Sequence, residues 1–236
     1  MIDTAVILAA GQGSRLRETA PIKPLCEVGG RALIDHAIAG LAEAGLRRAI
    51  VVLGYQGDAI ATHLASAPQP LSVGTVRMSD PTLPNGVSVL AAAPAVGDEA
   101  ALLVMCDHLV APALYARVAR AGAGGGVRLG IDRRLAHPWV DDEDVTRVRT
   151  DGERIVAIGK GLERYDAHDT GVFAIGPALF RALAGLPAPS LTDGVRVLAR
   201  EGRAQVVDCS GLDWIDVDDA PALAKAEAWL AEGVAA

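Results

Sequence analysis

The sequence has few aromatic residues, few cysteines and no excess of positive charge. Aromatic side chains make up 3% of its 236 residues, and its three cysteines, Cys26, Cys106 and Cys209, are far apart. No CxxC spacing indicates a zinc site or a redox pair, and a reduced compartment suits three unpaired thiols. The formal net charge is −7. A general attraction to phosphate backbones is therefore absent, and we expect no nucleic acid partner.

The sequence also lacks a long apolar run. Nothing approaches the roughly 18 consecutive apolar residues that cross a membrane, and the N-terminus has an acidic lead without a cleavage site. We therefore expect a cytoplasmic protein with no direct membrane insertion. Hydrophobic residues nevertheless make up 51% of the chain, which excludes disorder. We predict a single domain over residues 1–236, with an aliphatic core.

Short aliphatic runs alternate with amphipathic stretches. The runs at 5–9, 49–53 and 101–105 are typical of central strands that helices cover on both faces. Helical spacing follows the first run at 33–44 and recurs at 57–65, 87–93, 112–120, 177–184, 191–201 and 219–231. This alternation predicts an α/β fold, a three-layer α/β/α sandwich around a mostly parallel mixed sheet. Residues 146–150 and 154–158 alternate with the period of strands and predict a hairpin, as a small antiparallel elaboration.

The first predicted strand runs into a glycine-rich loop, Leu8-Ala9-Ala10-Gly11-Gln12-Gly13-Ser14-Arg15-Leu16. Backbone NH groups of such a loop can approach phosphate oxygens closely. Leu16 replaces the third glycine of a dinucleotide fingerprint, which excludes an NAD-dependent oxidoreductase, and the Walker pattern is absent. Arg15 and Lys23 add cations that can hold phosphate groups. The alternative is a structural turn with two solvated cations.

Acidic residues follow two further segments. Asp107 stands two residues beyond the end of the run 101–105, at the carboxyl end of a predicted central strand, where open α/β sheets bind ligands. Asp216 and Asp218 are one residue apart, so on an extended segment both side chains project to the same side. Carboxylates suit Mg²⁺, a cation that prefers oxygen ligands. Asp107 could instead cap the next helix, Asp219 is better explained as a helix N-cap, and the choice between Asp216 and Asp218 stays open, with Asp216 favoured.

The loop and the Lys23-Pro24-Leu25 segment that follows it resemble the N-terminal signature of the sugar-nucleotidyltransferase superfamily. The resemblance implies a GT-A-like, Rossmann-type nucleotidyltransferase fold with residues 1–120 as the nucleotide-binding half and 121–236 as the acceptor-binding half. It implies that Arg15 and Lys23 are catalytic residues, with Arg15 holding the departing pyrophosphate and Lys23 contacting the α-phosphate. It also implies that Asp107, Asp216 and Asp218 are metal ligands. The nucleotide-binding residues that it implies are Leu8, Ala9, Ala10, Gly11, Gly13, Ser14, Asn85, Gly86 and Ser88. For the segment 84–88, turn formation is the alternative.

The second half, residues 131–219, is most similar to the CTP:inositol-1-phosphate cytidylyltransferase branch of that superfamily. This resemblance implies transfer from CTP to a phosphorylated polyol, giving a CDP-alcohol and pyrophosphate, in a chain without the membrane half to which this branch is often fused. A membrane CDP-alcohol transferase would then use the product. The acceptor-binding residues implied are His108, Lys160, Asp169, Thr170 and Gly171. His137, Asp141, Asp142 and His168 are candidate polyol contacts, with exposed loop residues as the favoured alternative.

Other acceptors and one other class of function remain open. Related branches use phosphocholine, phosphonates or hexose 1-phosphates, and the N-terminal loop resembles all of them. A non-catalytic nucleotide-binding regulatory module would be expected to lose metal acids or the phosphate lysine, and all are present here. The sequence does not determine whether the chain forms a homo-oligomer.

Overall fold

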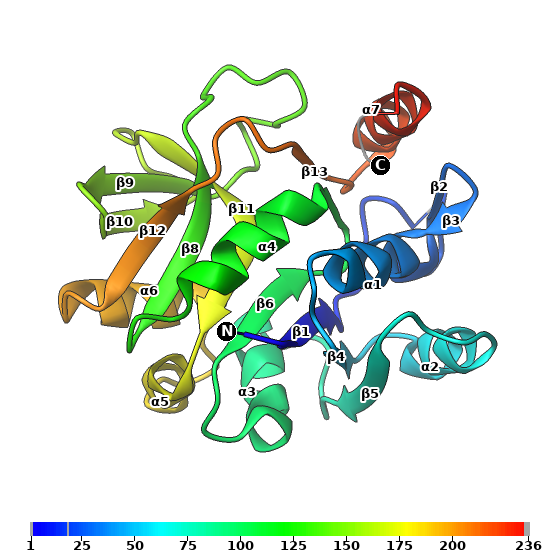
Figure 1. Ribbon diagram of the computed structural model, residues 1–236, viewed down its shortest axis with the longest axis horizontal. Helices are drawn as coiled ribbons and strands as arrows, with labels where there is room; N and C mark the ends of the chain where they lie inside the picture. Colours follow the sequence, from blue (N-terminus) through cyan, green and yellow to red (C-terminus); the bar gives the residue numbers. More distant parts are fainter. Residues whose placement is uncertain (1, 18, 234–236) are drawn as a thin grey trace.

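One nine-stranded sheet runs through the protein, and the computed structural model describes residues 2–17 and 19–233. Its strands stand side by side in the order β5, β4, β1, β6, β11, β8, β12, β10, β9 (Figure 1). Their bounds are β1 Thr4–Ala9, β4 Arg48–Leu53, β5 Ser72–Arg77, β6 Ala101–Met105, β8 Val127–Asp132, β9 Arg147–Asp151, β10 Arg154–Gly159, β11 Ala167–Ile175 and β12 Ala204–Asp208. The first four in this order are parallel, whereas β11 is antiparallel to both of its long neighbours, β6 and β8. The predicted mixed, mostly parallel α/β sheet is confirmed.

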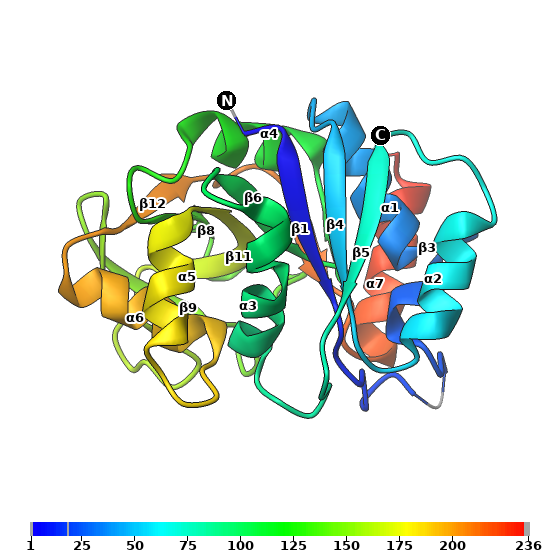
Figure 2. The same ribbon diagram turned by 90° about the horizontal axis from the view of Figure 1, so that it is seen from below.

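Helices cover both faces of the sheet and explain why its central strands are apolar throughout. The helices are α1 Leu33–Glu43, α2 Gly57–Ala65, α3 Asn85–Val96, α4 Pro112–Ala121, α5 Pro177–Ala184, α6 Leu191–Arg200 and α7 Ala220–Ala231. Along β1, Val6 and Leu8 face the core under α3, α5 and α6, while Ala5, Ile7 and Ala9 face the core under α1, α2 and α4. Figure 2 shows α3 and α5 in front of the sheet and α4 behind it. Alternation thus sends each side chain of β1 to one of two cores.

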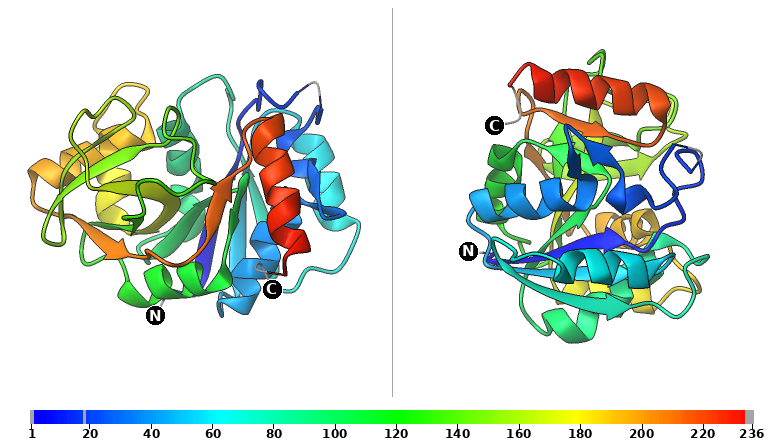
Figure 3. Two further views of the ribbon diagram at one scale, coloured as in Figure 1. Left: turned by 90° about the horizontal axis from the view of Figure 1, so that it is seen from above. Right: turned by 90° about the vertical axis from the view of Figure 1, so that its right-hand side faces the viewer.

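A third, smaller core ties both ends of the chain together. It contains Leu16 of the glycine-rich loop, Ile215 and Val217 near the C-terminus, and Trp229 of α7. It also holds two short antiparallel ribbons, one of β2 Glu27–Val28 with β3 Arg31–Ala32, the other of β7 His108–Val110 with β13 Trp214–Asp216. Figure 3 shows β13 leading into α7 beside the N-terminal segments. The third core therefore brings residues near 15, 108 and 216 into one region.

Local sequence signals fix most helix ends. Asp219 caps α7, because its carboxylate accepts a hydrogen bond from the Ala222 backbone NH at 2.8 Å. Gly45 has a φ of +92° directly after α1, as expected for a helix stop. The hairpin is confirmed as β9 and β10, although it extends the main sheet through β12 and forms no separate layer. No helix among the described residues is long and apolar enough to cross a bilayer.

The sequence patterns miss several strands, among them β5, β8 and β12 of the main sheet, and they shorten one helix. β5 is an edge strand with no fully buried residue, so its sequence has no apolar run. In β8 and β12, Arg128 and Gln205 interrupt the apolar pattern and hydrogen-bond to each other across the two strands at 2.9 Å. α3 extends beyond the predicted 87–93 and includes Pro94. Whether such a segment forms a strand depends on its pairing with neighbouring strands, and the periodicity of one segment does not show that pairing.

Candidate active site

Two adjoining cavities open at the carboxyl ends of β1 and β6. The first has a volume of about 380 Å³ and lies over the glycine-rich loop. Its wall includes Leu8, Ala10, Gly11, Gly13, Ser14, Arg15, Lys23, Asn85, Ser88, Asp107 and Asp218. Most of the predicted nucleotide-binding residues therefore surround one space.

The second cavity, of about 350 Å³, is formed mainly by the second half of the chain. Its wall includes His108, Trp139, Asp141, Asp142, Asp144, Lys160, Asp169, Gly171, Trp214 and Asp216. Arg15, Asn85, Met105 and Asp218 line both cavities. The predicted nucleotide and acceptor residues thus face two spaces that share a wall.

Lys23 lies at the junction of the two cavities, in contact with three carboxylates. Its side chain is 6% exposed, and its Nζ lies 2.7 Å from Asp107 Oδ2, 3.8 Å from Asp216 Oδ1, and in contact with Asp218. Burial disfavours the charged amine, but the three carboxylates outweigh it and raise the pKa of Lys23. The same contacts hold the pKa of Asp107 well below its usual range, against the effect of burial. Lys23 is therefore a cation that contacts every carboxylate of this acidic cluster.

His108 follows Asp107 and closes the cluster from the other side. Its Nδ1 lies 3.1 Å from Asp107 Oδ1, and its ring stacks on Trp214 with centroids 6.1 Å apart. Burial lowers the pKa of His108, but Asp216 and Asp107 overcome this and raise it to about 9. A protonated imidazole is thus placed against the acidic cluster.

The acidic cluster fits a divalent cation. Ligand atoms of Asp107, His108 and Asp216 lie within 4.8 Å of one another. Asp216 Oδ1 is buried without a hydrogen-bond partner, and burial, followed by the neighbouring Asp107 charge, raises the pKa of Asp216 to about 7. A hard cation would satisfy this orphaned oxygen and remove the repulsion between the carboxylates. The set favours Asp107 and Asp216 as metal-ligand candidates, while Asp218 is engaged with Lys23 and Arg15.

Asp144 is a site residue that the sequence patterns do not single out. Its Oδ2 lies 2.5 Å from Arg15 Nη2, and its Oδ1 contacts Lys160. Asp144 therefore links one cation from each half of the chain. Burial alone would raise its pKa, but Lys160 and Arg15 lower the pKa of Asp144 to about 2. The resemblance points instead to the neighbouring acids Asp141 and Asp142 as candidate polyol contacts. Nothing in their shared loop distinguishes Asp144 until the fold brings Arg15 and Lys160 to it.

Ala9, Gly86 and Thr170 line neither cavity. Ala9 alternates with Leu8 and Ala10, so its side chain enters the core on the opposite face of the sheet. Thr170 alternates with Asp169 and Gly171, is fully buried, and donates a hydrogen bond to the Gly130 carbonyl at 2.8 Å. Gly86 faces backbone, because a Cβ there would lie 2.5 Å from the Pro189 carbonyl oxygen. The side chains of Ala9 and Thr170 thus point away from both cavities and Gly86 packs against backbone, while the binding roles implied for these three residues stay predictions.

Asn85 and Ser88 face the first cavity from α3. Asn85 Oδ1 accepts a hydrogen bond from the Leu191 backbone NH at 2.8 Å, which fixes the side-chain amide where the two cavities meet. Ser88 donates to the sulfur of Met78 at 3.1 Å. The segment 84–88 is therefore the start of helix α3, with Pro84 as its N-cap, and not an isolated turn.

The four candidate polyol contacts divide into two groups. Asp141 and Asp142 are exposed and line the second cavity, and His137 is partly buried against Trp139, with ring centroids 5.0 Å apart. His168 is fully buried in β11 and stacks on Tyr165 with centroids 5.6 Å apart. The interpretation of His168 as an exposed loop residue is wrong, because β11 begins before it at Ala167.

Gly171 allows His108 to occupy its position. Gly171 has a φ of +76°, and a Cβ added to it would lie 2.7 Å from His108 Cδ2. Gly171→Ala is expected to destabilise the fold by about 1–3 kcal/mol through backbone strain. It is also expected to lower turnover roughly tenfold to a hundredfold, because the imidazole must move. Thermal unfolding and initial-rate measurements check the two effects.

Gly152→Ala provides the matched control. Gly152 also has a positive φ, of +57°, but a Cβ there would meet nothing within 4 Å. This variant is expected to lose stability without losing turnover. Equal turnover losses in the two variants would show that strain alone, and not displacement of His108, causes the effect.

Comparisons with known proteins show what the chain is similar to. The family profile described as MobA-like NTP transferase domain matches residues 5–206. A bifunctional IPC transferase and DIPP synthase of Rubrobacter xylanophilus is 36% identical over 97% of this chain, and one of Aquifex aeolicus is 29% identical over 98%. The chain spans about half the length of these relatives, 53% and 52% respectively.

Solved structures share the fold over the whole chain. The inositol-1-phosphate CTP transferase from T. maritima superposes with a TM-score of 0.84 at 24% identity, covering 100% of this chain and 98% of its own. A UDP-glucose pyrophosphorylase in complex with UDP-glucose gives 0.82 at 15% identity, covering 99% and 100%. At these identities the likeness establishes the fold alone.

Proposed function

The chain belongs to the MobA-like NTP transferase family, and we propose that it transfers a cytidylyl group from CTP to a phosphorylated polyol such as inositol 1-phosphate, with Mg²⁺ as cofactor. The observation that carries this proposal is the shared wall of the two cavities. Arg15, Asn85 and Asp218 line both cavities. The ion pair of Lys23 with Asp107 lies beside them. Two phosphate-bearing substrates, one in each cavity, would meet at that wall. The names of the relatives and of the T. maritima enzyme support CTP and inositol phosphate as the substrates.

In the proposed reaction, an oxygen of the acceptor phosphate forms a bond to the α-phosphorus of CTP. The bond between this phosphorus and the oxygen that bridges to the β-phosphate breaks, and pyrophosphate leaves with that electron pair. The attacking phosphate is already anionic, so the chain need not supply a base. The obstacle is the approach of two anions, and the protein must position them and neutralise their charge.

The residues of the shared wall suit that task. Arg15 lies beside both cavities and would hold the departing pyrophosphate in a bidentate contact. Lys23, now paired with Asp107 and Asp218, would turn its ammonium toward the α-phosphate. A Mg²⁺ ion held by Asp107 and Asp216 would supply further positive charge to the phosphate oxygens.

The second cavity favours a polyhydroxylated acceptor. Asp141, Asp142 and Asp169 line it, and carboxylates accept hydrogen bonds from hydroxyl groups. Lys160 supplies a cation for the acceptor phosphate. An aromatic cage for the ammonium of phosphocholine would need free ring faces, but Trp139 packs against Trp229 and Trp214 against His108, with ring centroids 5.2 and 6.1 Å apart. The cavity is thus better suited to a polyol phosphate than to phosphocholine.

A substrate panel tests the proposal. The four NTPs would each be combined with inositol 1-phosphate, phosphocholine, a phosphonate and a hexose 1-phosphate, and pyrophosphate release would be measured with Mg²⁺ present. We expect the highest kcat/KM for CTP with inositol 1-phosphate. Exclusive use of GTP would contradict the cytidylyl assignment. Nucleotide binding without turnover across the panel would favour a regulatory module instead.

A further inference from the structure

The short ribbon of β7 and β13 carries much of the acidic cluster. Asp216 is opposite His108 in this ribbon, and the Val217 backbone NH donates to the Asp107 carbonyl at 3.0 Å. A two-stranded ribbon is only marginally stable by itself. Something outside it must therefore fix where Asp216 stands relative to Asp107.

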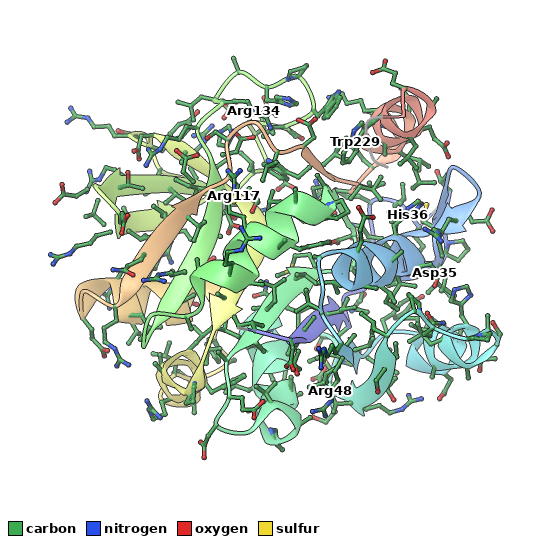
Figure 4. The ribbon with its side chains drawn as sticks, in the orientation of Figure 1. Asp35, His36, Arg48, Arg117, Arg134 and Trp229 are labelled. Carbon is green, nitrogen blue, oxygen red and sulfur yellow. The ribbon has the colours of Figure 1, made fainter. Side chains whose placement is uncertain are left out.

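Asp132, at the end of β8, is the centre of a hydrogen-bonded network that reaches β13. Its side chain is fully buried, and Oδ2 accepts hydrogen bonds from Arg134 Nη2 at 2.8 Å and from the Trp214 indole at 3.1 Å. Arg134 also donates to the Leu212 carbonyl at 3.0 Å and to Asp213 Oδ1 at 2.9 Å. Figure 4 labels Arg134 where the loop after β8 approaches the segment that leads to β13. The network thus holds residues 212–214, which enter β13, against the main sheet.

Trp214 links this network to the site in two ways. Its ring stacks on His108, with an interplanar angle of 10°, and it stands two residues before Asp216 on the same strand. Asp132 itself lines neither cavity among the described residues. Its contacts with the site run through Trp214 and through the segment 212–213 that Arg134 holds.

We infer that Asp132 is a positioning residue of the active site, which through Trp214 and Arg134 fixes the ribbon that carries His108 and Asp216. This inference rests on the proposed metal-dependent transfer. A buried indole NH needs an acceptor in any fold. Here the acceptor belongs to the main sheet, whereas the indole belongs to the strand that carries a candidate metal ligand. The consequence is a change of metal affinity when a residue outside the ligand set is altered.

Asp132→Asn tests this inference, with Mn²⁺ as the probe. The amide keeps the shape of the carboxylate but loses its charge, and its NH2 group must face other donors, either the Arg134 backbone NH and Nε at the Oδ1 position or Arg134 Nη2 and the Trp214 indole at the Oδ2 position. We expect the dissociation constant of Mn²⁺, measured by electron paramagnetic resonance on the protein without substrates, to rise about tenfold, as for other outer-shell partners. Amide hydrogen exchange is expected to quicken at residues 107–110 and 213–217 and to stay unchanged in β1 and β4.

Asp166→Asn is the matched control. Asp166 Oδ2 lies 2.6 Å from Nη1 of Arg133, the residue before Arg134. Its other hydrogen bonds come from Thr150, so it does not contact β13. Both variants are expected to melt at lower temperature, and only Asp132→Asn should weaken Mn²⁺ binding. A lower melting temperature with unchanged Mn²⁺ affinity would reduce Asp132 to a structural residue and overturn the inference.

Trp214→Phe keeps the inference falsifiable if Asp132→Asn does not fold. Phenylalanine retains a ring against His108 and removes the indole donor to Asp132. By itself, Trp214→Phe should raise the Mn²⁺ dissociation constant by a factor similar to that expected for Asp132→Asn, because it breaks the link between β8 and β13. Unchanged Mn²⁺ affinity in Trp214→Phe would contradict the inference. Mn²⁺ binding and hydrogen exchange need no turnover, so failure of the proposed cytidylyl transfer would be seen separately, in the wild-type substrate panel.

Discussion

Lys23→Met is expected to lower the rate of pyrophosphate release at least about a hundredfold, because it removes a preorganised cation from the reacting phosphates. Methionine is similar in length and apolar, so packing around the buried stem is largely kept. Lys23 is only 6% exposed and lies between Asp107 and Asp218. Turnover at saturating CTP and acceptor is the measurement, and a near-normal rate would remove Lys23 from the mechanism.

The same substitution is expected to make the stability of the protein depend on Mg²⁺. Without Lys23, the three carboxylates lose the cation that contacts all of them, while His108 and Arg15 each neutralise only part of the cluster. We expect this loss to cost about 3 kcal/mol of unfolding free energy. The carboxylates are 24–37% exposed, so this is at the low end of the cost of breaking a buried ion pair. A divalent cation that binds the folded state would restore part of it. Thermal melting in EDTA and in Mg²⁺ should show a larger difference for Lys23→Met than for the wild type.

Asp107→Asn is expected to reduce turnover by a similar factor, at least about a hundredfold. The amide is nearly isosteric, but it is neutral, and it can offer a cation only one weaker oxygen. Asp107 contacts Lys23 at 2.7 Å and His108 at 3.1 Å, so the variant keeps neighbours that now carry excess positive charge. Initial rates against Mg²⁺ concentration should show both a lower maximum and a higher half-saturating concentration.

A distant aspartate controls for the loss of one negative charge. Asp58 pairs with Arg77, and its side chain is 94% exposed. Asp58→Asn is expected to leave turnover and Mg²⁺ dependence unchanged. If Asp107→Asn were equally active while its circular dichroism matched the wild type, Asp107 would not be a metal ligand.

Short-range patterns were sufficient wherever one segment carried its own signal. The aliphatic run before Ala10 predicts β1, Asp219 predicts the start of α7, and Gly45 predicts the end of α1. The acids near 107 and 216 and the cations at 15 and 23 could be singled out because such residues at strand ends suit phosphate and metal chemistry. Ala9 and Thr170 show the limit of a motif, since alternation along a strand turns them away from the cavities that their neighbours line.

The sequence by itself determined the fold class and the family, because both depend on periodicity and on a contiguous motif in the first 25 residues. Only the tertiary structure decided which charges meet. Asp144 joins Arg15 to Lys160, and Asp132 reaches Trp214, across separations along the chain that no local pattern records. The physical reason is that ion pairs and hydrogen bonds act over a few ångströms of space, whereas their partners are brought together by strand order and by the third core.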